Sequence, residues 1–340
     1  MSVSEDLRKF YSKMVTEVTD LVLHPDDLGN KVNDLVEDVI ASEVHPEIDE
    51  WMGRQFFPGF RAKTAEFCFE NWSPKKGDVL VASFMKTGTH WVREIVRQLF
   101  YQHDKELVDV TKKIGFFFAY LESGLPCKFD VVDDLPFPRR IFGSHMPAEL
   151  INVEKYVANG VKIIYVYRNP KDQLVSFFHF MQSMQFQDTQ KWQQIFPSNW
   201  NKFYDSFTNG EQPIGLEKGQ TYVDHILSWY KHYNNDSVLF VKYEDLKKDP
   251  HSMISRIANF AEVDVTKDDV TAIVENTSFK KMKENADKEE TAAQSGEKML
   301  TIFRNGKTGG WKDYFTVAQS EKMDRMFQKL DGTDIFFNYE

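Results

Sequence analysis

Short apolar runs alternate with amphipathic stretches through the middle of the chain. Runs rich in β-branched and other apolar residues occur at 78–84 (DVLVASF), 161–167 (VKIIYVY) and 237–243 (SVLFVKY). Each is followed by a few polar residues and then by apolar residues at helical spacing, which predicts three strand-loop-helix units. Apolar strands joined by helices form parallel sheets covered on both faces, so we predict an α/β fold in which a single-domain parallel β-sheet is flanked by helices.

The three predicted helices carry different signals. The first has apolar residues along one face, namely Trp91, Val92, Ile95, Val96, Leu99 and Phe100. The second begins at Pro170, and proline suits a first helical turn because its missing N–H would have no partner there. The third covers about 249–261, and a further β-like run at 139–144 precedes His145. Ligands of parallel sheets bind beyond the carboxyl ends of the strands, so the loops that follow the strands should line one site.

The remaining segments have weaker patterns. Residues 1–44 alternate charged and apolar residues at helical spacing, which predicts a helical N-terminal extension packed on the main domain at 45–340. Residues 182–219 contain turn formers and aromatics without a clear period, so we predict a long loop that could act as a lid. The charged stretch at 280–298 is expected to be exposed or mobile.

Composition narrows the class of protein. The 340 residues include 42 Lys and Arg against 52 Asp and Glu, a net charge of −10. No apolar run approaches the roughly 20 residues of a membrane helix, and the polar N-terminus lacks the features of a secretory signal. We therefore expect a cytoplasmic protein with no membrane partner and no nucleic-acid partner, because nucleic-acid binding needs a basic surface. Cys68 and Cys127 are isolated, so we predict no metal site and no disulfide framework.

The loop at 84–91 (FMKTGTHW) joins the first predicted strand to its helix. It places Lys86, two threonine hydroxyls and Gly88 at a helix N-terminus, where free N–H groups and the helix dipole favour an anion. It differs from the P-loop of nucleotide hydrolases, in which the lysine follows the second glycine, because here Lys86 precedes Gly88.

Two other segments carry phosphate-type chemistry. Arg168 ends the second predicted strand and Ser176 follows two helical turns later, and arginine is suited to bidentate phosphate recognition. The segment 304–312 (RNGKTGGWK) is basic and rich in glycine, so its backbone could fold closely around an anion. Three such elements on one parallel sheet point together to a phosphorylated ligand.

At this point the sequence resembles the cytosolic sulfotransferase family, over about residues 46–330. The segments 84–91, 167–180 and 304–312 are similar to the family's signatures in order and approximate spacing. The resemblance implies a P-loop-like sulfotransferase fold at 45–340 and transfer of a sulfuryl group from 3′-phosphoadenosine 5′-phosphosulfate (PAPS) to a hydroxyl or amine, leaving 3′-phosphoadenosine 5′-phosphate (PAP). It implies neither a metal nor a covalent enzyme intermediate.

The resemblance also assigns roles to matching positions. Lys86 would bridge the sulfate and the 5′-phosphate and stabilise charge on the leaving oxygen, as positioned charges do in such transfers. The 5′-phosphate and adenine would be held by Thr87, Gly88, Thr89, His90 and Trp91. The 3′-phosphate would be recognised by Arg168, Ser176, Arg304, Asn305 and Gly306. The adenosine pocket would be completed by Tyr243, Thr277 and Phe279.

The acceptor hydroxyl needs a base, and histidine has a suitable pKa of about 6.5. The chain has nine histidines, and residue chemistry alone does not choose among them. The resemblance selects His145, which stands before Met146-Pro147 in a context similar to that of the family's catalytic histidine.

Several positions depart from the family pattern. Met85 replaces a usual proline and His90 a usual hydroxyl residue, so that a protonated His90 could donate to the phosphate. Gly143 and Ser144 replace a common Lys-Thr, which removes a cation from the acceptor side. Asn305 replaces a usual lysine, so donor affinity should rest more heavily on the remaining arginines.

The acceptor and the oligomeric state are less defined by the sequence. Phe180 matches a family position that lines the acceptor site, and Phe178 and Phe117 are plausible additions, which together favour a small hydrophobic hydroxylated substrate. Residues 312–321 (KDYFTVAQSE) fit the family's dimerisation pattern and predict a homodimer with a small interface. The same residues also fit a helix that begins with Thr316 as its N-cap.

Three alternatives stay open at this point. A same-fold enzyme could eliminate the sulfated product and so act as a dehydratase, which product mass would distinguish. A P-loop kinase or NTPase would transfer phosphoryl from ATP, although Lys86 is misplaced for it. A non-catalytic protein would bind the nucleotide without turnover.

Overall fold

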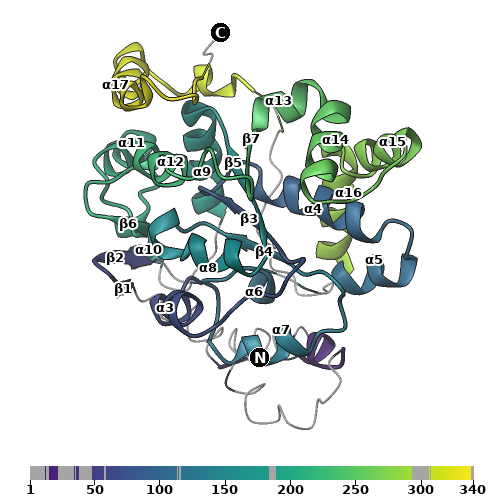
Figure 1. The fold of residues 1–340 in the computed structure, drawn as a ribbon. Helices are drawn as coiled ribbons and strands as arrows, with labels where there is room; N and C mark the ends of the chain where they lie inside the picture. Colours follow the sequence, from purple (N-terminus) through teal and green to yellow (C-terminus); the bar gives the residue numbers. More distant parts are fainter. Residues whose placement is uncertain are drawn as a thin grey trace.

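We analysed a computed structural model of the chain, which describes residues 12, 15–21, 34, 36–37, 48–56, 59–112, 114, 116–183, 189–292, 306 and 308–337. At its centre lies a four-stranded sheet in the order β4-β3-β5-β7, formed by β3 (Val79–Ser83), β4 (Ile141–Ser144), β5 (Lys162–Tyr167) and β7 (Val238–Lys242). All of its strand pairs are parallel. The predicted α/β fold with a parallel sheet flanked by helices is confirmed (Figure 1).

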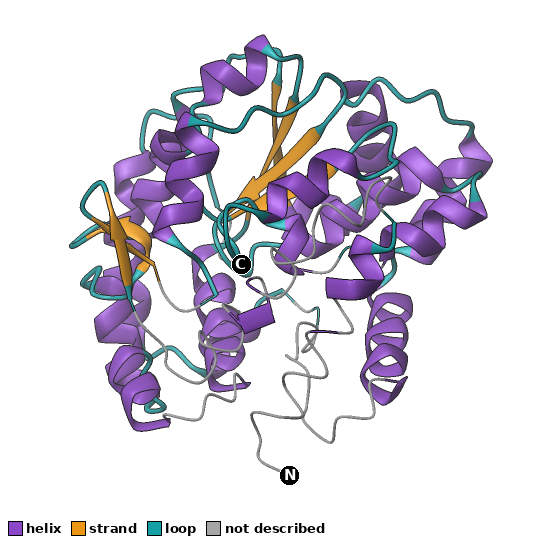
Figure 2. Cartoon of the chain, turned by 90° about the horizontal axis from the view of Figure 1, so that it is seen from below, coloured by secondary structure: helices purple, strands orange, loops and turns teal. Residues whose placement is uncertain are grey.

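A second, antiparallel sheet has the order β1-β2-β6, with β1 (Asp49–Trp51), β2 (Arg54–Phe56) and β6 (Ile214–Glu217). It lies apart from the main sheet (Figure 2). The sequence analysis predicted none of these three strands, because each has only three or four residues and shows no sustained alternation.

Helices surround the main sheet. The first half of the chain contributes α3 (Ala62–Glu70), α4 (Thr89–Tyr101), α5 (Lys105–Lys112), α6 (Phe116–Ala119), α7 (Lys128–Asp134), η2 (Ala148–Leu150), α8 (Val153–Ala158) and α9 (Pro170–Ser183). The second half contributes α10 (Thr189–Ile195), α11 (Trp200–Thr208), α12 (Tyr222–Tyr230), α13 (Tyr243–Lys248), α14 (Pro250–Phe260), α15 (Lys267–Asn276), α16 (Phe279–Ala292), η3 (Gly310–Asp313), α17 (Val317–Phe327) and η4 (Gln328–Leu330).

The sheet separates two hydrophobic cores, as the period of two along its strands dictates. In β3, Val79 and Val81 join the core beneath α4, α14 and α15, whereas Leu80 and Ala82 join the larger core on the other face. Both faces of the sheet are therefore covered. A ligand is expected to bind at the carboxyl ends of its strands, as in other parallel sheets.

The three strand-loop-helix units occur where the sequence placed them. The helix after β3 begins at Thr89, and α9 begins at Pro170. The third unit differs in detail, because β7 is followed by the short helix α13 before α14 begins behind its N-cap Asp249. Glu244 and Asp245, the polar residues that follow the third apolar run, thus lie in the first turn of a helix rather than in a loop.

The prediction of a long loop at 182–219 is wrong. Within the described part of this segment lie α10, α11 and the strand β6. The sequence analysis overlooked a helical period in α11, because Trp200, Phe203, Tyr204 and Phe207 are spaced to share one face. Phe203 and Phe207 are buried against Phe177 of α9. The charged stretch that begins at 280 is helical as far as Ala292, with exposed side chains along 280–285 except for a half-buried Met282.

The N-terminal extension predicted at 1–44 falls largely outside the described residues. Within the described part, residues 15–19 are helical, and Val15, Val18 and Val36 are buried in the larger core.

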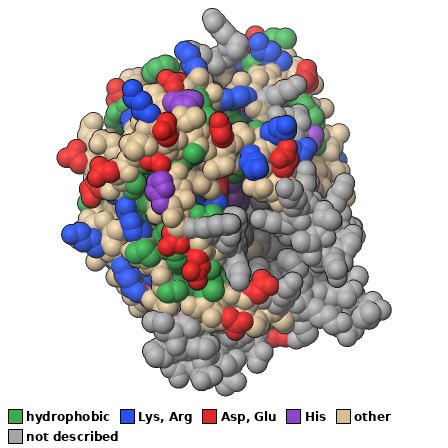
Figure 3. Space-filling view, turned by 90° about the vertical axis from the view of Figure 1, so that its right-hand side faces the viewer, with side chains coloured by type: hydrophobic (Ala, Val, Ile, Leu, Met, Phe, Trp, Pro, Cys, Tyr) green, Lys and Arg blue, Asp and Glu red, His purple; other side chains and the backbone are tan. Residues whose placement is uncertain are grey.

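On the described part of the face shown in Figure 3, acidic and basic side chains are interspersed. No helix within the described ranges is long and apolar enough to cross a membrane.

Candidate functional site

The loop between β3 and α4 has an unusual backbone. Lys86 has φ of 66° and Gly88, the N-cap of α4, has φ of 113°. Gln173 donates to the Met85 carbonyl at 2.8 Å, and Arg168 donates to the Lys86 carbonyl at 3.3 Å. A non-glycine residue in the left-handed region is strained, and these two hydrogen bonds from the neighbouring unit hold the strained turn in place.

The N-terminus of α4 is open to an anion. Gly88 offers no side-chain cap, and the first turn contains no acidic residue. A Cβ on Gly88 would lie 2.8 Å from the Tyr243 ring, so the turn also needs glycine to accommodate that ring. The first N–H groups of α4 and the positive end of its dipole are therefore available to a negatively charged group.

The two threonines of the loop use their hydroxyls inside the protein. Thr87 donates to the Phe84 carbonyl at 2.8 Å and lies 3.2 Å from the Val166 carbonyl, so it can serve an anion only through its main chain. The Thr89 hydroxyl lies 2.5 Å from the Ser83 hydroxyl. Ser83 is in turn next to His145, which connects the loop to the predicted base.

His145 stands directly after the end of β4, on the strand next to β3. Its Nδ1 lies 3.0 Å from the Ser83 carbonyl and 3.4 Å from the Ser83 hydroxyl. A carbonyl oxygen only accepts, so Nδ1 carries the proton and Nε2 presents its lone pair. Its main-chain N–H donates to Glu122 Oε1 at 2.6 Å, which fixes the backbone beneath the ring.

Burial and nearby cations lower the pKa values of the three basic side chains in this site, His145, Lys86 and His90. Desolvation, together with Lys86 and Arg93, lowers the pKa of His145 to about 4. Desolvation and the Arg168 charge lower the pKa of Lys86 to about 7. Burial, then Arg93, Lys86 and His145, lower the pKa of His90 well below its usual value. The protonated His90 considered from the sequence is therefore disfavoured, and a neutral ring remains.

Arg168 is buried at the end of β5. Its guanidinium lies 4.5 Å from the centre of the Tyr243 ring, and its main-chain N–H donates to the Tyr222 hydroxyl at 3.0 Å. Tyr243 also makes an edge contact with Trp91, with ring centres 5.4 Å apart. The residues assigned to adenine and to the 3′-phosphate are thus neighbours across two strand ends, and Ser176 lies half-buried on α9.

At Gly306 the C-terminal segment meets α13 and α16, close to the end of α15. Thr277 caps the end of α15 and is buried, and its hydroxyl donates to the Ile273 carbonyl. Gly306 packs so closely on Phe279 that an added Cβ would lie 2.4 Å from the ring, and Lys247 donates to the Gly306 carbonyl. Arg304 and Asn305 lie outside the described residues.

The predicted acceptor residues have different surroundings. Phe180 is half-buried, and Lys86 Nζ lies 4.2 Å from its ring centre. Phe178 is buried against Trp200 and Phe203 of α11, as a core residue would be. The side chain of Phe117 lies outside what the structure describes.

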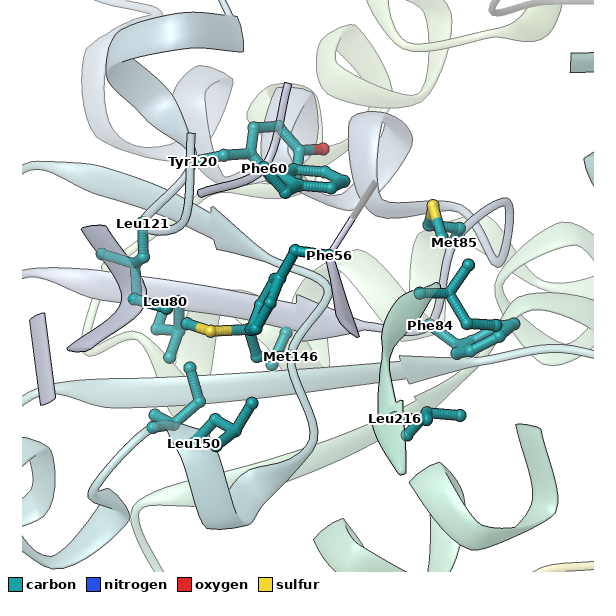
Figure 4. Close-up of a cluster of buried hydrophobic side chains, with 14 of the residues drawn as sticks. Phe56, Phe60, Leu80, Phe84, Met85, Tyr120, Leu121, Met146, Leu150 and Leu216 are labelled. Atoms are coloured by element: carbon teal, nitrogen blue, oxygen red, sulfur yellow. The ribbon is translucent and has the colours of Figure 1, made fainter. Parts of the chain in front are cut away.

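Three residues that the sequence analysis missed surround His145. The rings of Tyr120 and Phe60 lie 5.0 Å and 5.9 Å from its ring, at the edge of the buried cluster drawn in Figure 4. The third is Glu122, whose pKa burial raises to about 7. A carboxylate directly after the apolar run 116–121 was the one signal that could have drawn attention to this segment.

The structure also explains Gly143. A Cβ at this position would lie 2.9 Å from two carbons of the Tyr120 ring, so any side chain there would displace that ring.

Within the described ranges there is no group of three or more His, Cys, Asp or Glu residues that could hold a metal ion.

Comparisons with known proteins agree with one another. A family model described as "Sulfotransferase domain" matches residues 76–333. Among curated proteins, Sulfotransferase 1C2 of Rattus norvegicus is 31% identical and covers 80% of this chain and 91% of its own length. Amine sulfotransferase of Oryctolagus cuniculus is 34% identical and covers 76% of this chain and 82% of its own length.

Solved structures are similar as well. Mouse sulfotransferase SULT7A1 complexed with PAP has a TM-score of 0.65 and 28% identity, over 84% of this chain and 96% of that one. A retinol dehydratase in complex with retinol and PAP also has a TM-score of 0.65, but at 21% identity this is a likeness of the fold alone, over 89% of this chain and 96% of that one.

Proposed function

The chain belongs to the sulfotransferase family and is a PAPS-dependent sulfotransferase, and we propose that it transfers the sulfuryl group of PAPS to a hydroxyl or amine of a small hydrophobic acceptor by in-line displacement. In this proposal His145 is the general base and Lys86 stabilises the leaving phosphate. The observation that carries the proposal is that both residues lie just beyond the carboxyl ends of the adjacent parallel strands β3 and β4, with His145 hydrogen-bonded to Ser83 at the end of β3.

The residues present fit a donor with two anionic ends. The uncapped N-terminus of α4 and Lys86 would hold the 5′ end, and Arg168 would hold the 3′-phosphate, with Ser176 and Gly306 nearby in the family's pattern. Trp91 and Tyr243 would border the adenine, since they contact each other beside the same loop. The Trp91 Nε1 is buried without a hydrogen-bond partner within the described residues, which is consistent with a polar ligand there.

His145 is suited to accept a proton. Because its Nδ1 donates to the Ser83 carbonyl, Nε2 is the basic atom, and the lowered pKa keeps the ring neutral at pH 7. The acceptor proton moves to Nε2 as the acceptor oxygen forms its bond to sulfur. The ring is held by the side chains of Tyr120 and Phe60 and by the Glu122 hydrogen bond to its main chain.

Lys86 is suited to stabilise the leaving phosphate, on the other side of the sulfur from the acceptor. The bound donor supplies a sulfuryl group whose S–O bond to the phosphate breaks, leaving negative charge on a phosphate oxygen. The Lys86 ammonium stabilises that charge, and a polyanion beside it would raise its lowered pKa and keep it charged.

The acceptor side is aromatic. Phe60, Tyr120 and Phe180 approach His145 and Lys86, and apolar walls of this kind select hydrophobic molecules. This supports a small hydrophobic hydroxylated acceptor.

The first experiment is calorimetric binding of PAP to the wild-type protein, Lys86→Ala and Arg168→Ala. We expect the wild type to bind, and Arg168→Ala to bind about 10- to 100-fold more weakly, as the loss of a charged hydrogen-bonding group predicts. A folded protein that does not bind PAP would overturn the proposal.

The second experiment measures turnover with PAPS over a panel of phenols, alcohols and amines. His145→Ala should lose the transfer while retaining PAP binding, because the base contacts only the acceptor. Product mass separates a sulfate ester from an elimination product, and turnover in His145→Ala equal to that of the wild type would remove His145 from the mechanism.

We also propose that Lys312–Glu321 mediates a homodimer. The Thr316 side chain caps α17 and forms a capping box with Gln319, as the alternative interpretation predicted, but Val317 is 76% exposed beside it. An exposed apolar residue on a short segment suits a small self-complementary contact. Light scattering of Val317→Glu would show a monomer if this contact forms the dimer, whereas an unchanged dimer would place the interface elsewhere.

A further inference from the structure

Arg93, a half-buried residue of α4, places its guanidinium over the Tyr120 ring and forms no ion pair with a carboxylate in the part of the chain that the structure describes. Its Nε is buried and makes no hydrogen bond within the described part of the chain. The next arginine on the same helix, Arg97, is by contrast ion-paired with Glu94 and donates to the Val108 carbonyl. A guanidinium has five donors in a fixed fork, and leaving its Nε desolvated without a partner costs free energy that a bound anion would recover.

The guanidinium lies beside the predicted base. Arg93 sits 5.2 Å from the centre of the Tyr120 ring, and that ring packs 5.0 Å from His145 and 6.0 Å from His90. The Tyr120 hydroxyl is buried near the side chains of Arg93 and Thr89. Since any Cβ at Gly143 would collide with this ring, the absence of a side chain there allows Tyr120 to lie between the strand end and Arg93.

The charge of Arg93 reaches the reaction site without being cancelled. It lowers the pKa of both His145 and His90. Glu122, a buried acid beside Tyr120 and His145, accepts the His145 main-chain N–H at Oε1, and burial raises its pKa to about 7, which disfavours its charged form. Within the described residues no ion pair joins Arg93 to a carboxylate, so its charge is available to an anionic group of a ligand on this side of the site.

Arg93 lies on the acceptor side of this site. The proposed donor groups are the first turn of α4, Lys86 and Arg168, whereas Arg93 stands one helical turn beyond Thr89, about 6 Å along the axis. Its guanidinium lies over Tyr120, which contacts Phe60 and His145, the residues that face the acceptor.

We propose that Arg93 binds an acidic group of the acceptor, so that this enzyme acts on hydrophobic hydroxylated molecules that carry a carboxylate or similar oxyanion. The inference rests on the proposed function and narrows its substrate class. Arginine pairs with such groups through two parallel hydrogen bonds, and burial strengthens the pair because it excludes water. Arg93 is in this role a specificity-determining residue.

The test uses acceptor pairs that differ only in charge. The probes are 6-hydroxy-2-naphthoate with its carboxamide, and 12-hydroxydodecanoate with its carboxamide, titrated into the PAP-loaded protein. Wild type, Arg93→Met, Arg93→Lys and the matched control Arg97→Met are compared, with thermal unfolding to verify folding. PAP binding itself is measured first, so failure of the proposed function is detected separately from failure of this inference.

We expect the wild type to bind at least one carboxylate about 10- to 100-fold more tightly than its amide, the range for a charge-assisted hydrogen bond. Arg93→Met should lose that preference while retaining amide affinity and PAP affinity, Arg93→Lys should keep part of it, and Arg97→Met should keep all of it. The inference is overturned if no carboxylate is preferred, if Arg93→Met retains the preference, or if Arg93→Met weakens PAP as strongly as the carboxylates. The last outcome would place Arg93 on the donor side.

Discussion

The β3–α4 and β5–α9 connections share the order of strand, short loop and helix, yet their helix N-termini differ. At α4, Gly88 gives no side-chain cap and the first turn has no acid. At α9, the Asn169 side chain accepts from the N–H groups of Lys171 at 2.9 Å and Asp172 at 3.4 Å, and Asp172 adds a carboxylate to the first turn.

The difference shows how one local pattern serves two forms of anion recognition. The open end of α4 can bind a phosphate through main-chain N–H groups. At the closed end of α9 the side chain of Arg168 would bind the phosphate instead. The Asp172 carboxylate accepts from the N–H groups of Gly309 and Trp311, and these hydrogen bonds hold the C-terminal glycine-rich segment in place.

The largest expected effect comes from removing the cation at the open end. Lys86→Met should lower turnover about 100- to 1,000-fold, because a charge aimed at the leaving oxygen contributes most in the transition state. Initial rates with PAPS measure this, and the exposed Lys202→Met is the matched control. Equal rates in Lys86→Met and the wild type would show that the α4 end works through its main chain alone.

The backbone of the open end is tested by alanine at its N-cap. Gly88→Ala combines a left-handed φ with a Cβ 2.8 Å from Tyr243, so we expect the free energy of unfolding to fall by about 2–3 kcal/mol. Gly219→Ala shares the positive φ but meets nothing within 4 Å, and should cost about 1 kcal/mol. Urea unfolding compares the two variants, and equal losses would mean that the Tyr243 contact is irrelevant.

The pH dependence of PAP binding reports on Lys86. Its pKa in the free protein is about 7, below the usual value, so the charged form that binds an anion is lost as the pH rises above 7. PAP affinity should therefore fall by up to about tenfold per pH unit above 7, until the raised pKa of the complex is reached. Calorimetry of Lys86→Met at the same pH values should lack this dependence, and a slope identical to that of the wild type would assign it to another group.

The smallest effect is expected at the closed end. Asn169→Ala removes the cap of α9 and should reduce the free energy of unfolding by about 1 kcal/mol. PAP affinity should change by less than about threefold, because the Asp172 carboxylate in the first turn of α9 disfavours a bound anion at this helix end. A large loss of PAP affinity would show that Asn169 itself contacts the ligand.

Much of this site was predictable from local sequence. The turn at 84–91 and the strand end at Arg168 were found from strand patterns followed by glycine, proline and basic residues, and the family resemblance on which their roles depend is confirmed. The small antiparallel sheet, Arg93, Tyr120 and Glu122 were missed, because their roles come from contacts across the fold rather than from neighbours in the chain.

The sequence by itself determined the order of strands, loops and helices, since hydrophobic period and the backbone limits of glycine and proline act over a few residues. Only the tertiary structure decided the chemical state of the site. Burial lowers the pKa of His145 and keeps its ring neutral, and the Ser83 carbonyl at the end of β3 holds the proton on Nδ1. Burial, followed by the Arg168 charge at the end of β5, lowers the pKa of Lys86. Burial and charge depend on residues distant in sequence, and no local pattern encodes them.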